Sequence, residues 1–284
     1  MTVTRGLGLA PDPVRWDWYS GSLVDSVDSG LVVSVLSASL DADPKLGVPR
    51  HGYQRCVQLA RGEHVVAQVM SGGSHETPYV QASGSSSGSV AKVLRANWTH
   101  RVSRVDACVD FDAEGAWEAV LGQVLTVTRQ RGISKRQAGD WIDPHQRPGD
   151  GRTLYAGGQS SAVQGRFYEK GRQLPDAGRP YWVRGEIQIR PAKAAKRAMA
   201  LVDPRGAWGA SAWSADVLER LTGDAVPPAR VVNYVEPDNH RRYLAMLRQY
   251  GRTLDLVAEQ YGGDWSQLGL VLRDDLAASR RSSH

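Results

Sequence analysis

Two segments of the chain, residues 166–170 and 181–190, alternate polar and apolar side chains with a period of two. The first reads Arg-Phe-Tyr-Glu-Lys and the second reads Tyr-Trp-Val-Arg-Gly-Glu-Ile-Gln-Ile-Arg. This period is typical of a β-strand, in which successive side chains point to opposite faces. The alternation therefore predicts two strands of a sheet, and it assigns each of their side chains to one face.

One face of these two strands carries polar side chains. In the first strand the alternation places Arg166, Tyr168 and Lys170 together. In the second strand it turns a valine and two isoleucines toward the core. The polar residues of the second strand are then Arg184, Glu186, Gln188 and Arg190. A tyrosine hydroxyl, cations that can bind phosphate and a carboxylate on one face are the groups that an attack on a phosphodiester requires.

Further patterns along the chain indicate a mixed fold. Strand patterns cover residues 52–59, 64–70, 78–82, 100–111 and 153–156, and the first two predict a β-hairpin. Helical patterns cover residues 90–98, 113–132, 193–201, 216–221, 237–262 and 264–276. Residues 30–36 fit a short strand or the start of a helix. The predicted fold class is α+β, an open, mostly antiparallel sheet with helices on one face and a small α-helical C-terminal module.

Composition and patterning divide the chain into three predicted parts. Residues 1–13 are expected to form a flexible arm, residues 14–203 a domain built on the sheet, and residues 204–284 a helical C-terminal domain. An apolar stripe along residues 237–262 is interpreted as a packing surface. Gly165 and Gly185 interrupt predicted strands where larger residues would fit, and they indicate local bulges.

Three carboxylates belong to one predicted strand. Asp106 and Asp110 project from the same face, and Asp112 follows at the strand end. Like charges at this spacing repel unless a cation neutralises them. A divalent metal ion bound through oxygen ligands is one solution. Arginines of the same or a neighbouring strand, Arg101 and Arg104 among them, are the other solution.

The basic surplus of the chain coincides with the tyrosine segment. The formal net charge is +5, and residues 129–205 hold 16 Lys and Arg against 7 Asp and Glu, a net charge of +9. This local surplus is typical of a protein that binds a phosphate backbone. A solvated basic face without a partner is the alternative.

Several function classes lack their signatures in this sequence. The chain has no Gly-x-x-x-x-Gly-Lys-Ser/Thr loop, no Cys-x-x-Cys zinc pattern, no Gly-x-Ser-x-Gly motif and no His-x-His pair. Tyrosine and carboxylates are then the groups left to carry a reaction. Cys56 and Cys108 lie far apart in strand-like runs and are interpreted as reduced core thiols. With no signal peptide and no long apolar run, a cytoplasmic protein that does not bind membranes is expected.

Four motifs occur in order: Arg-Val-Asp-Ala-Cys-Val-Asp-Phe at 104–111, Tyr-Ala-Gly-Gly-Gln-Ser at 155–160, Arg-Phe-Tyr-Glu-Lys-Gly at 166–171 and Val-Arg-Gly-Glu-Ile-Gln-Ile at 183–189. Together with the Trp-Asp-Trp-Tyr-Ser run at 16–20, they resemble the Rep_trans family. This family comprises rolling-circle replication initiators of Gram-positive plasmids, relatives in filamentous phages and relaxases of some conjugative elements. The resemblance covers roughly residues 14–200 and leaves the helical tail outside.

The resemblance implies a nicking and joining enzyme with a tyrosine nucleophile and a divalent metal ion, Mg²⁺ or Mn²⁺. Carried over by motif, Tyr168 is the nucleophile, and it would leave a 5′-phosphotyrosine link and a free 3′-OH. Glu186, with Asp106 or Asp110, would hold the metal ion. Glu169 is a weaker candidate because alternation points it away from Tyr168.

The cations near the tyrosine would then contact DNA. Arg166, Lys170, Arg184 and Arg190 are the candidate DNA-binding residues. Three of them, Arg166, Lys170 and Arg184, are also expected to lower the pKa of the tyrosine phenol through their positive charge. Tyr155 is the reserve nucleophile.

The sequence thus predicts a metal-dependent, tyrosine-type DNA endonuclease and strand transferase that initiates rolling-circle replication. A conjugative relaxase of the same family and an origin-binding protein without catalysis are the alternatives. The strand at Trp16 begins close to the first residue, which favours replication over conjugation. The expected partner is origin DNA, single-stranded or cruciform at the nick, and a host helicase and a second copy of the chain are further candidates.

Overall fold

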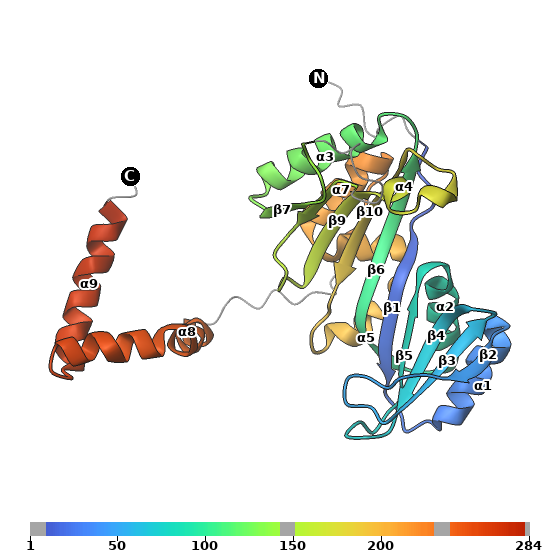
Figure 1. Ribbon diagram of the computed structural model, residues 1–284, viewed down its shortest axis with the longest axis horizontal. Helices are drawn as coiled ribbons and strands as arrows, with labels where there is room; N and C mark the ends of the chain where they lie inside the picture. The colour runs from blue at the N-terminus through green and yellow to red at the C-terminus, as the bar shows by residue number, and fades with distance from the viewer. Residues whose placement is uncertain (1–9, 143–150, 230–238, 282–284) are drawn as a thin grey trace. The chain divides into compact units, whose positions relative to one another are not determined.

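The structure is a computed structural model, and it describes residues 10–142, 151–229 and 239–281. The chain divides into two compact units, residues 1–233 and residues 234–284. The first unit holds the sheet, and the second holds two helices (Figure 1). Most of the arm predicted at residues 1–13 lies outside the described residues.

The sheet of the first unit contains ten strands in the described residues, and every pairing is antiparallel. The strands are β1 (Arg15–Leu23), β2 (Asp43–Leu46), β3 (Arg55–Arg61), β4 (His64–Ser71), β5 (Tyr79–Ser83), β6 (His100–Asp112), β7 (Lys135–Ala138), β8 (Thr153–Ala156), β9 (Val163–Glu169) and β10 (Trp182–Ile189). Their order is β2-β3-β4-β5-β1-β6-β10-β9-β8-β7. The first strand of the chain therefore lies in the middle of the sheet, beside β6.

Helices pack on the apolar face of this sheet. The α-helices are α1 (Ser29–Leu40), α2 (Ser87–Asn97), α3 (Ala116–Gln130), α4 (Lys170–Gln173), α5 (Ala195–Met199), α6 (Pro204–Ala207), α7 (Ala212–Thr222), α8 (Asn239–Gln260) and α9 (Trp265–Arg281), and the 3₁₀ turns are η1 (Gly84–Ser86), η2 (Pro175–Ala177) and η3 (Trp208–Ala210). Helices α1 and α2 contact strands β2 to β5 and β1, whereas α3 and α6 contact β6, β9, β10 and β1. This arrangement confirms the predicted α+β class. None of the helices in the described part of the chain is both long and apolar enough to cross a membrane.

Most predicted elements are confirmed, and residues 30–36 are resolved in favour of a helix. The hairpin of β3 and β4 and the strand β5 lie where the alternation placed them. Residues 30–36 belong to α1, whose N-terminus is capped by Asp28 through a bond from the Gly30 amide. Their apolar run faces the sheet through Val32 and Leu36, and a short apolar run of this kind does not distinguish a helix from a strand.

The two strand glycines serve packing, and the bulges predicted there are wrong. The register between β9 and β10 is continuous across Gly165 and Gly185. A Cβ atom on Gly165 would lie 2.8 Å from the ring of Phe167 and 2.9 Å from that of Trp213. Glycine at this position therefore leaves space for two core aromatic rings, and the strand itself is regular.

The sheet unit extends past residue 203, the boundary predicted from composition. Trp208, Trp213 and Leu218 join the same apolar core as Phe167, because η3 and α7 pack against the helices and strands of the first unit. Ser211 caps α7 by accepting from the Ser214 amide. The division into a functional domain at residues 14–203 and a helical domain at residues 204–284 remains a prediction.

In the second unit, α8 and α9 form a helical pair joined at Gly262 and Gly263, both with positive φ. Ala258 and Leu268 are its buried apolar residues among those described. Tyr243 and Tyr250, which belong to the predicted stripe, are about half exposed at 52% and 51%. The stripe is therefore only partly packed within its own unit.

Candidate active site

The polar faces of β1, β6, β10 and β9 meet at the centre of the sheet. In the register, Arg184 lies opposite Asp110 on one side and opposite Tyr168 on the other, and Arg166 lies opposite Glu186. The alternation predicted from the sequence is confirmed, since Val183, Ile187 and Ile189 are buried in the core on the other face. One sheet face thus brings the predicted nucleophile, carboxylates and cations together.

Tyr168 lies at the centre of this face and is 1% exposed. Its hydroxyl donates a long hydrogen bond of 3.5 Å to Oε2 of Glu186. The guanidinium of Arg166 lies 4.6 Å from the ring centroid, and Nζ of Lys170 lies 5.6 Å from it. The side chain is held between a carboxylate and two cations.

The pKa of Tyr168 is raised, so the expectation of a lowered value is wrong for this structure. Burial raises the pKa most, and the charge of Glu186 raises it further. Arg166 and Arg184 lower it without cancelling these two effects. Sequence identifies the neighbouring cations, but the cost of placing a phenolate in a buried site depends on the folded structure.

Glu186 is buried and forms an ion pair with Arg166, whose Nη2 lies 2.9 Å from its Oε2. Burial, followed by the charge of Asp106, raises the pKa of Glu186 to about 7, while Arg166 acts in the opposite direction. Near neutral pH this carboxyl group therefore exists in both protonation states. Asp106 lies near enough to Glu186 for the two charges to repel.

The two aspartates of β6 are neutralised by arginines, the alternative that the sequence left open beside a metal ion. Asp106 accepts from Nε of Arg104 at 2.9 Å. Asp110 accepts from Nε and Nη2 of Arg184 at 2.7 and 2.9 Å, and it also pairs with Arg15. Burial would raise the pKa of Asp110, but the bonds from Arg184 and Arg15 hold it below its usual value. Asp110 is thus already held by two cations.

The four candidate DNA-binding residues differ in how freely they could meet a phosphate. Arg166 and Arg184 are engaged with Glu186 and Asp110, and Arg184 also contacts Asp17 at 2.7 Å. Lys170 begins α4 beside the Tyr168 ring, and burial lowers its pKa. Arg190 is exposed, and its Nη1 lies 3.4 Å from the Gln159 carbonyl oxygen.

Sequence reasoning did not assign Arg15 and Asp17 to the site, and it named Arg104 only as one of the arginines that could neutralise the aspartates of β6. Arg15 and Asp17 come from β1 and reach Asp110 and Arg184 only because β1 pairs with β6 in the centre of the sheet. The Trp-Asp-Trp-Tyr motif at residues 16–19 was the available signal for Asp17. A motif does not reveal which distant side chain its aspartate will contact.

Aromatic rings and cations alternate on the same face. The guanidinium of Arg104 lies 4.5 Å from the ring centroid of Trp18. The guanidinium groups of Arg179 and Arg184 lie 4.5 Å and 5.3 Å from the ring centroid of Trp182. Stacked arginine and aromatic planes are the arrangement with which proteins hold unpaired nucleic-acid bases.

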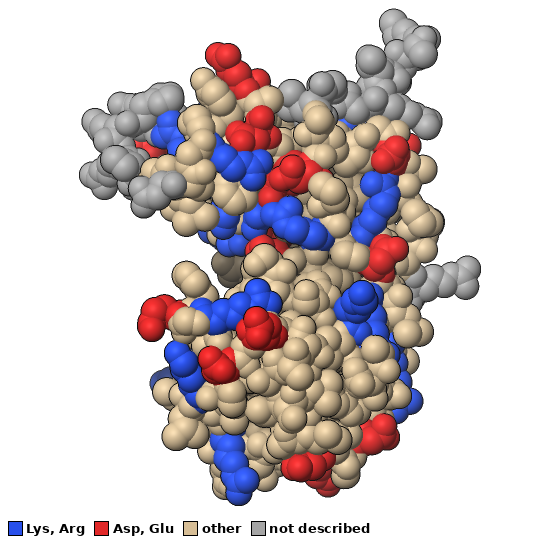
Figure 2. Space-filling model, turned by 90° about the vertical axis from the view of Figure 1, so that its right-hand side faces the viewer, with Lys and Arg blue, Asp and Glu red and all other residues tan. Residues whose placement is uncertain are grey.

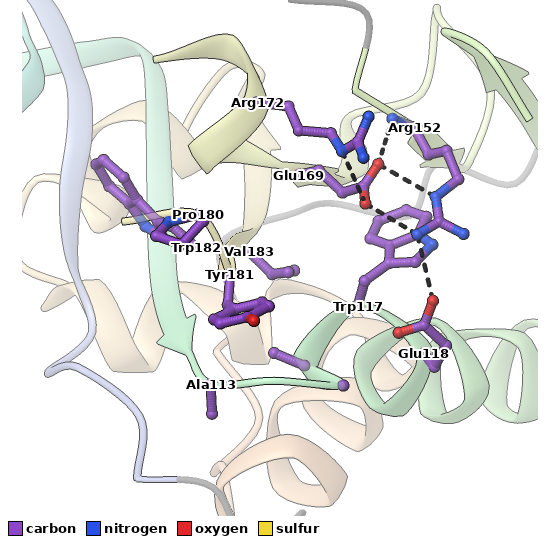
Figure 3. A pocket seen from close by; sticks show the side chains of 12 residues that line it. Ala113, Trp117, Glu118, Arg152, Glu169, Arg172, Pro180, Tyr181, Trp182 and Val183 are labelled. Carbon is purple, nitrogen blue, oxygen red and sulfur yellow. Dashed lines mark hydrogen bonds and ion pairs between the residues drawn. The ribbon is translucent and has the colours of Figure 1, made fainter. Parts of the chain in front are cut away.

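Glu169 faces a different part of the molecule, as the alternation predicted. Figure 3 shows its carboxylate between the guanidinium groups of Arg152 and Arg172. Oε2 of Glu169 also accepts from the Arg152 amide at 2.7 Å. Together with Trp117 and Tyr181, these residues line a pocket of about 390 Å³. The role of Glu169 is to fix the end of β9, away from the Tyr168 hydroxyl.

Charges of opposite sign are interleaved over part of the molecular surface. On the face drawn in Figure 2, basic and acidic side chains lie next to one another over the upper half. The ion pairs of Arg152 with Glu118 and of Arg179 with Asp112 are examples of this interleaving. The net charge of +9 over residues 129–205 therefore does not produce a uniformly basic surface.

The donor set of the site fits a divalent cation at one position. No group of three His, Cys, Asp or Glu side chains suited to a metal ion occurs within residues 10–142, 151–229 and 239–281. Asp106 and Glu186 are two buried carboxylates that are each paired with one arginine, and the charge of Asp106 still raises the pKa of Glu186; a cation bound by both would relieve that repulsion. Mg²⁺ commonly binds one or two carboxylates and keeps several water ligands. Asp110, saturated by two arginines, fits less well.

The raised pKa of Glu186 makes a prediction for stability. Its folded value of about 7 lies above the usual 4.5, so protonation favours the folded state. The contribution is fully present below pH 4.5 and is lost as the pH rises through 7. One pKa unit corresponds to about 1.4 kcal/mol, so the loss is of the order of 3 kcal/mol.

The measurement is the free energy of unfolding between pH 4.5 and 8.5, by urea denaturation in EDTA, for the wild type and for Glu186→Gln. The wild type is expected to lose stability relative to the variant as the pH rises. Parallel profiles would show that Glu186 titrates normally.

Residues 101–219 match the model of the family Rep_trans, described as replication initiation factor. This segment contains all four motifs from which the resemblance was inferred, and the match confirms that resemblance.

A solved structure of the rolling circle replication initiator protein from Geobacillus stearothermophilus is similar to this chain. The identity is 21%, the TM-score is 0.47, and the match covers 68% of this chain and 79% of the other. The comparison with curated proteins gave no match.

Proposed function

We propose that this protein nicks and rejoins one strand of origin DNA to initiate rolling-circle replication, with Tyr168 as the nucleophile. The observation that carries the proposal is the juxtaposition of the Tyr168 hydroxyl with Glu186 and Arg166 on β9 and β10. The match of residues 101–219 to a replication initiation factor family supports it. The proposed location is the cytoplasm, and a host helicase and a homodimer remain predictions.

In the proposed reaction the Tyr168 oxygen attacks the scissile phosphorus. The bond from phosphorus to the 3′ oxygen breaks, a bond from phosphorus to the tyrosine oxygen forms, and the 3′ oxygen leaves as a hydroxyl. Joining reverses these steps, with the 3′-OH attacking the phosphotyrosine link. The phenolic proton must leave Tyr168, whose raised pKa makes this loss the costly step, and the departing 3′ oxygen takes up a proton, so that the reaction as a whole moves one proton from the tyrosine to the 3′ oxygen.

The surrounding side chains have separate proposed roles. Arg166 lies over the Tyr168 ring and would stabilise both the phenolate and the phosphate. Lys170 and Arg184 would orient the strand, while exposed Arg190 would contact its backbone further away. A phosphate would compete with Glu186 for Arg166, so DNA binding is expected to loosen that ion pair.

Glu186 and Asp106 are proposed to hold a divalent metal ion. When bound, such an ion would polarise a phosphoryl oxygen and neutralise developing charge. Binding would also keep Glu186 ionised at neutral pH, where the site without metal is partly protonated. Asp110 is proposed instead to hold Arg184 in place.

An origin-binding protein without catalysis is the second candidate function. The burial of Tyr168 and its raised pKa favour this alternative, since both oppose formation of a phenolate. A conjugative relaxase would use the same chemistry on a transfer origin, and the DNA sequence that is cut distinguishes it from a replication initiator.

The test is incubation with supercoiled DNA of the protein's own replicon and Mg²⁺ or Mn²⁺, followed by denaturing electrophoresis and peptide mapping. A covalent adduct at Tyr168 is expected. Binding without an adduct in either metal would favour the second candidate.

In the variant Glu186→Gln, covalent adduct formation is expected to become slower and to lose its dependence on the metal ion. The substitution keeps the shape of the side chain and removes a charged oxygen ligand, so adduct formation should fall at least about 100-fold and respond little to Mn²⁺. Glu169→Gln is the matched control, because that carboxylate faces Arg152 and Arg172 instead. An unchanged Mn²⁺ titration in Glu186→Gln would remove this residue from the metal site.

A further inference from the structure

Four basic side chains surround a pocket at the end of β6 where His100 begins the strand. The pocket has a volume of about 570 Å³ and is lined by Arg101 of β6 together with Lys193, Ala194, Lys196 and Arg197 in and before α5. We call these four cations the α5 basic cluster. Lys193 has φ of 48°, a left-handed conformation that non-glycine residues rarely adopt.

The α5 basic cluster differs from the candidate active site in having no acidic partner. Arg166, Arg184 and Arg104 each form an ion pair with a carboxylate of the sheet. Within the described part of the chain, no hydrogen bond or ion pair engages the side chains of Arg101, Lys193, Lys196 and Arg197. Four neighbouring cations without a counter-charge repel one another, and an anion would remove that cost.

The cluster lies at the end of the sheet where β6 begins. Arg101 alternates with buried His100 and Val102, and the register shift between Ser20 and Gly21 of β1 allows its side chain to share the polar face with Arg104. The other three cations lie in and before α5, which packs against the core through Met199. Figure 1 shows α5 at one end of β6 and β10, and α4, which directly follows β9, at the other end. The cluster and Tyr168 therefore lie toward opposite ends of β6 and β10.

The lining of the pocket distinguishes between two forms of DNA. Proteins that hold single strands combine cations with aromatic rings on which bases stack. Such rings surround the candidate active site, where Trp18 and Trp182 lie beneath arginines. The lining residues of the α5 pocket include no aromatic side chain among those described. This is the chemistry of a contact to phosphates whose bases are paired and hidden.

We propose that the α5 basic cluster binds the phosphate backbone of the DNA duplex that flanks the nick. The place of this contact relative to the nick rests on the proposed function of Tyr168, whereas the contact itself does not. Arg101 lies seven residues along β6 from Cys108, which is opposite Glu186. At about 3.3 Å per residue this is about 23 Å, or about seven base pairs of duplex at 3.4 Å each.

The experiment measures binding of a fluorescent 30-base-pair duplex of mixed sequence to the full chain at several salt concentrations. The variant is Lys193→Gln/Arg197→Gln, which removes two exposed cations of the cluster. The slope of log affinity against log salt is expected to fall by about 2, with a loss of 10- to 100-fold in affinity near 0.1 M salt. Binding of a 30-nucleotide single strand should change less.

The matched control is Lys92→Gln/Arg129→Gln, which removes the same charge from exposed positions on α2 and α3. The control should retain the wild-type slope. If both variants lose the same affinity and slope, the effect is a general electrostatic attraction between the protein and DNA, and the proposal is overturned. An unchanged slope in the cluster variant would overturn it as well. If the slope falls as expected while no adduct forms at Tyr168, the duplex contact stands and the nicking function fails.

Discussion

Tyr168→Phe is expected to reduce covalent adduct formation and strand cleavage by at least about 1,000-fold, while affinity for DNA changes only a few-fold. The substitution removes the attacking oxygen and leaves the ring, so the stacking of Arg166 at 4.6 Å is preserved. Cleavage of labelled origin DNA, followed by denaturing electrophoresis, gives both the rate and the adduct. Fluorescence anisotropy of the same DNA gives the affinity.

Tyr155→Phe is the control for this result. Tyr155 lies on the neighbouring strand β8 opposite Arg166, and the guanidinium of Arg136 lies 4.0 Å from its ring centroid. It is the reserve nucleophile predicted from the sequence, and its variant should cut DNA as the wild type does. If Tyr155→Phe loses activity while Tyr168→Phe retains it, the nucleophile is Tyr155.

Arg184→Leu is expected to destabilise the protein by about 3–5 kcal/mol. The side chain of Arg184 is 5% exposed, and that of its partner Asp110 is fully buried. Removing the arginine leaves a carboxylate in the core with Arg15 as its remaining cation. The free energy of unfolding, from urea denaturation at pH 7, measures this loss. A decrease of less than about 1 kcal/mol relative to the wild type would show that water or Arg15 neutralises Asp110 in place of Arg184.

The double variant Arg184→Leu/Asp110→Leu separates structure from DNA binding. Replacing both partners of a buried ion pair with apolar residues is often neutral, so much of the lost stability should return. Asp17 and Arg15 are partly exposed and can be solvated once their partners are gone. If the stable double variant still binds DNA as the wild type does, Arg184 has a structural role; weaker binding would support its assignment as a DNA contact.

Sequence predicted the sheet because alternation is a local property. The faces of β9 and β10 followed from residues two apart, and the site residues Tyr168, Glu186 and Arg166 were grouped correctly for the same reason. Arg104, the partner of Asp106, was among the arginines named as candidates, because it lies two residues away on the same strand. The partners of Asp110, Arg184 and Arg15, were not assigned, because they depend on strand order. Asp17 and Arg184 are separated by 167 residues, and no local pattern links them.

The pKa of Tyr168 could not be predicted from the sequence, because burial also depends on how distant segments pack. From the sequence, three cations around Tyr168 were expected to lower its pKa. In the folded chain the ring and hydroxyl are enclosed, and desolvation outweighs those charges. The amphipathic stripe of α8 has the same limit. Its helical period predicts that a helix forms, but it does not predict whether Tyr243 and Tyr250 become buried in the folded chain.

The position of β1 in the sheet has a consequence for synthesis of the chain. Asp17 of β1 is synthesised early, yet its partner Arg184 follows 167 residues later. At 5–20 residues per second, this interval lasts roughly 10 to 30 s. During that time β6 can pair with β1 but has no β10 on its other side, and an unpaired strand edge invites association with other chains. A nascent chain released before β10 would carry neither the assembled site nor the strand that protects β6.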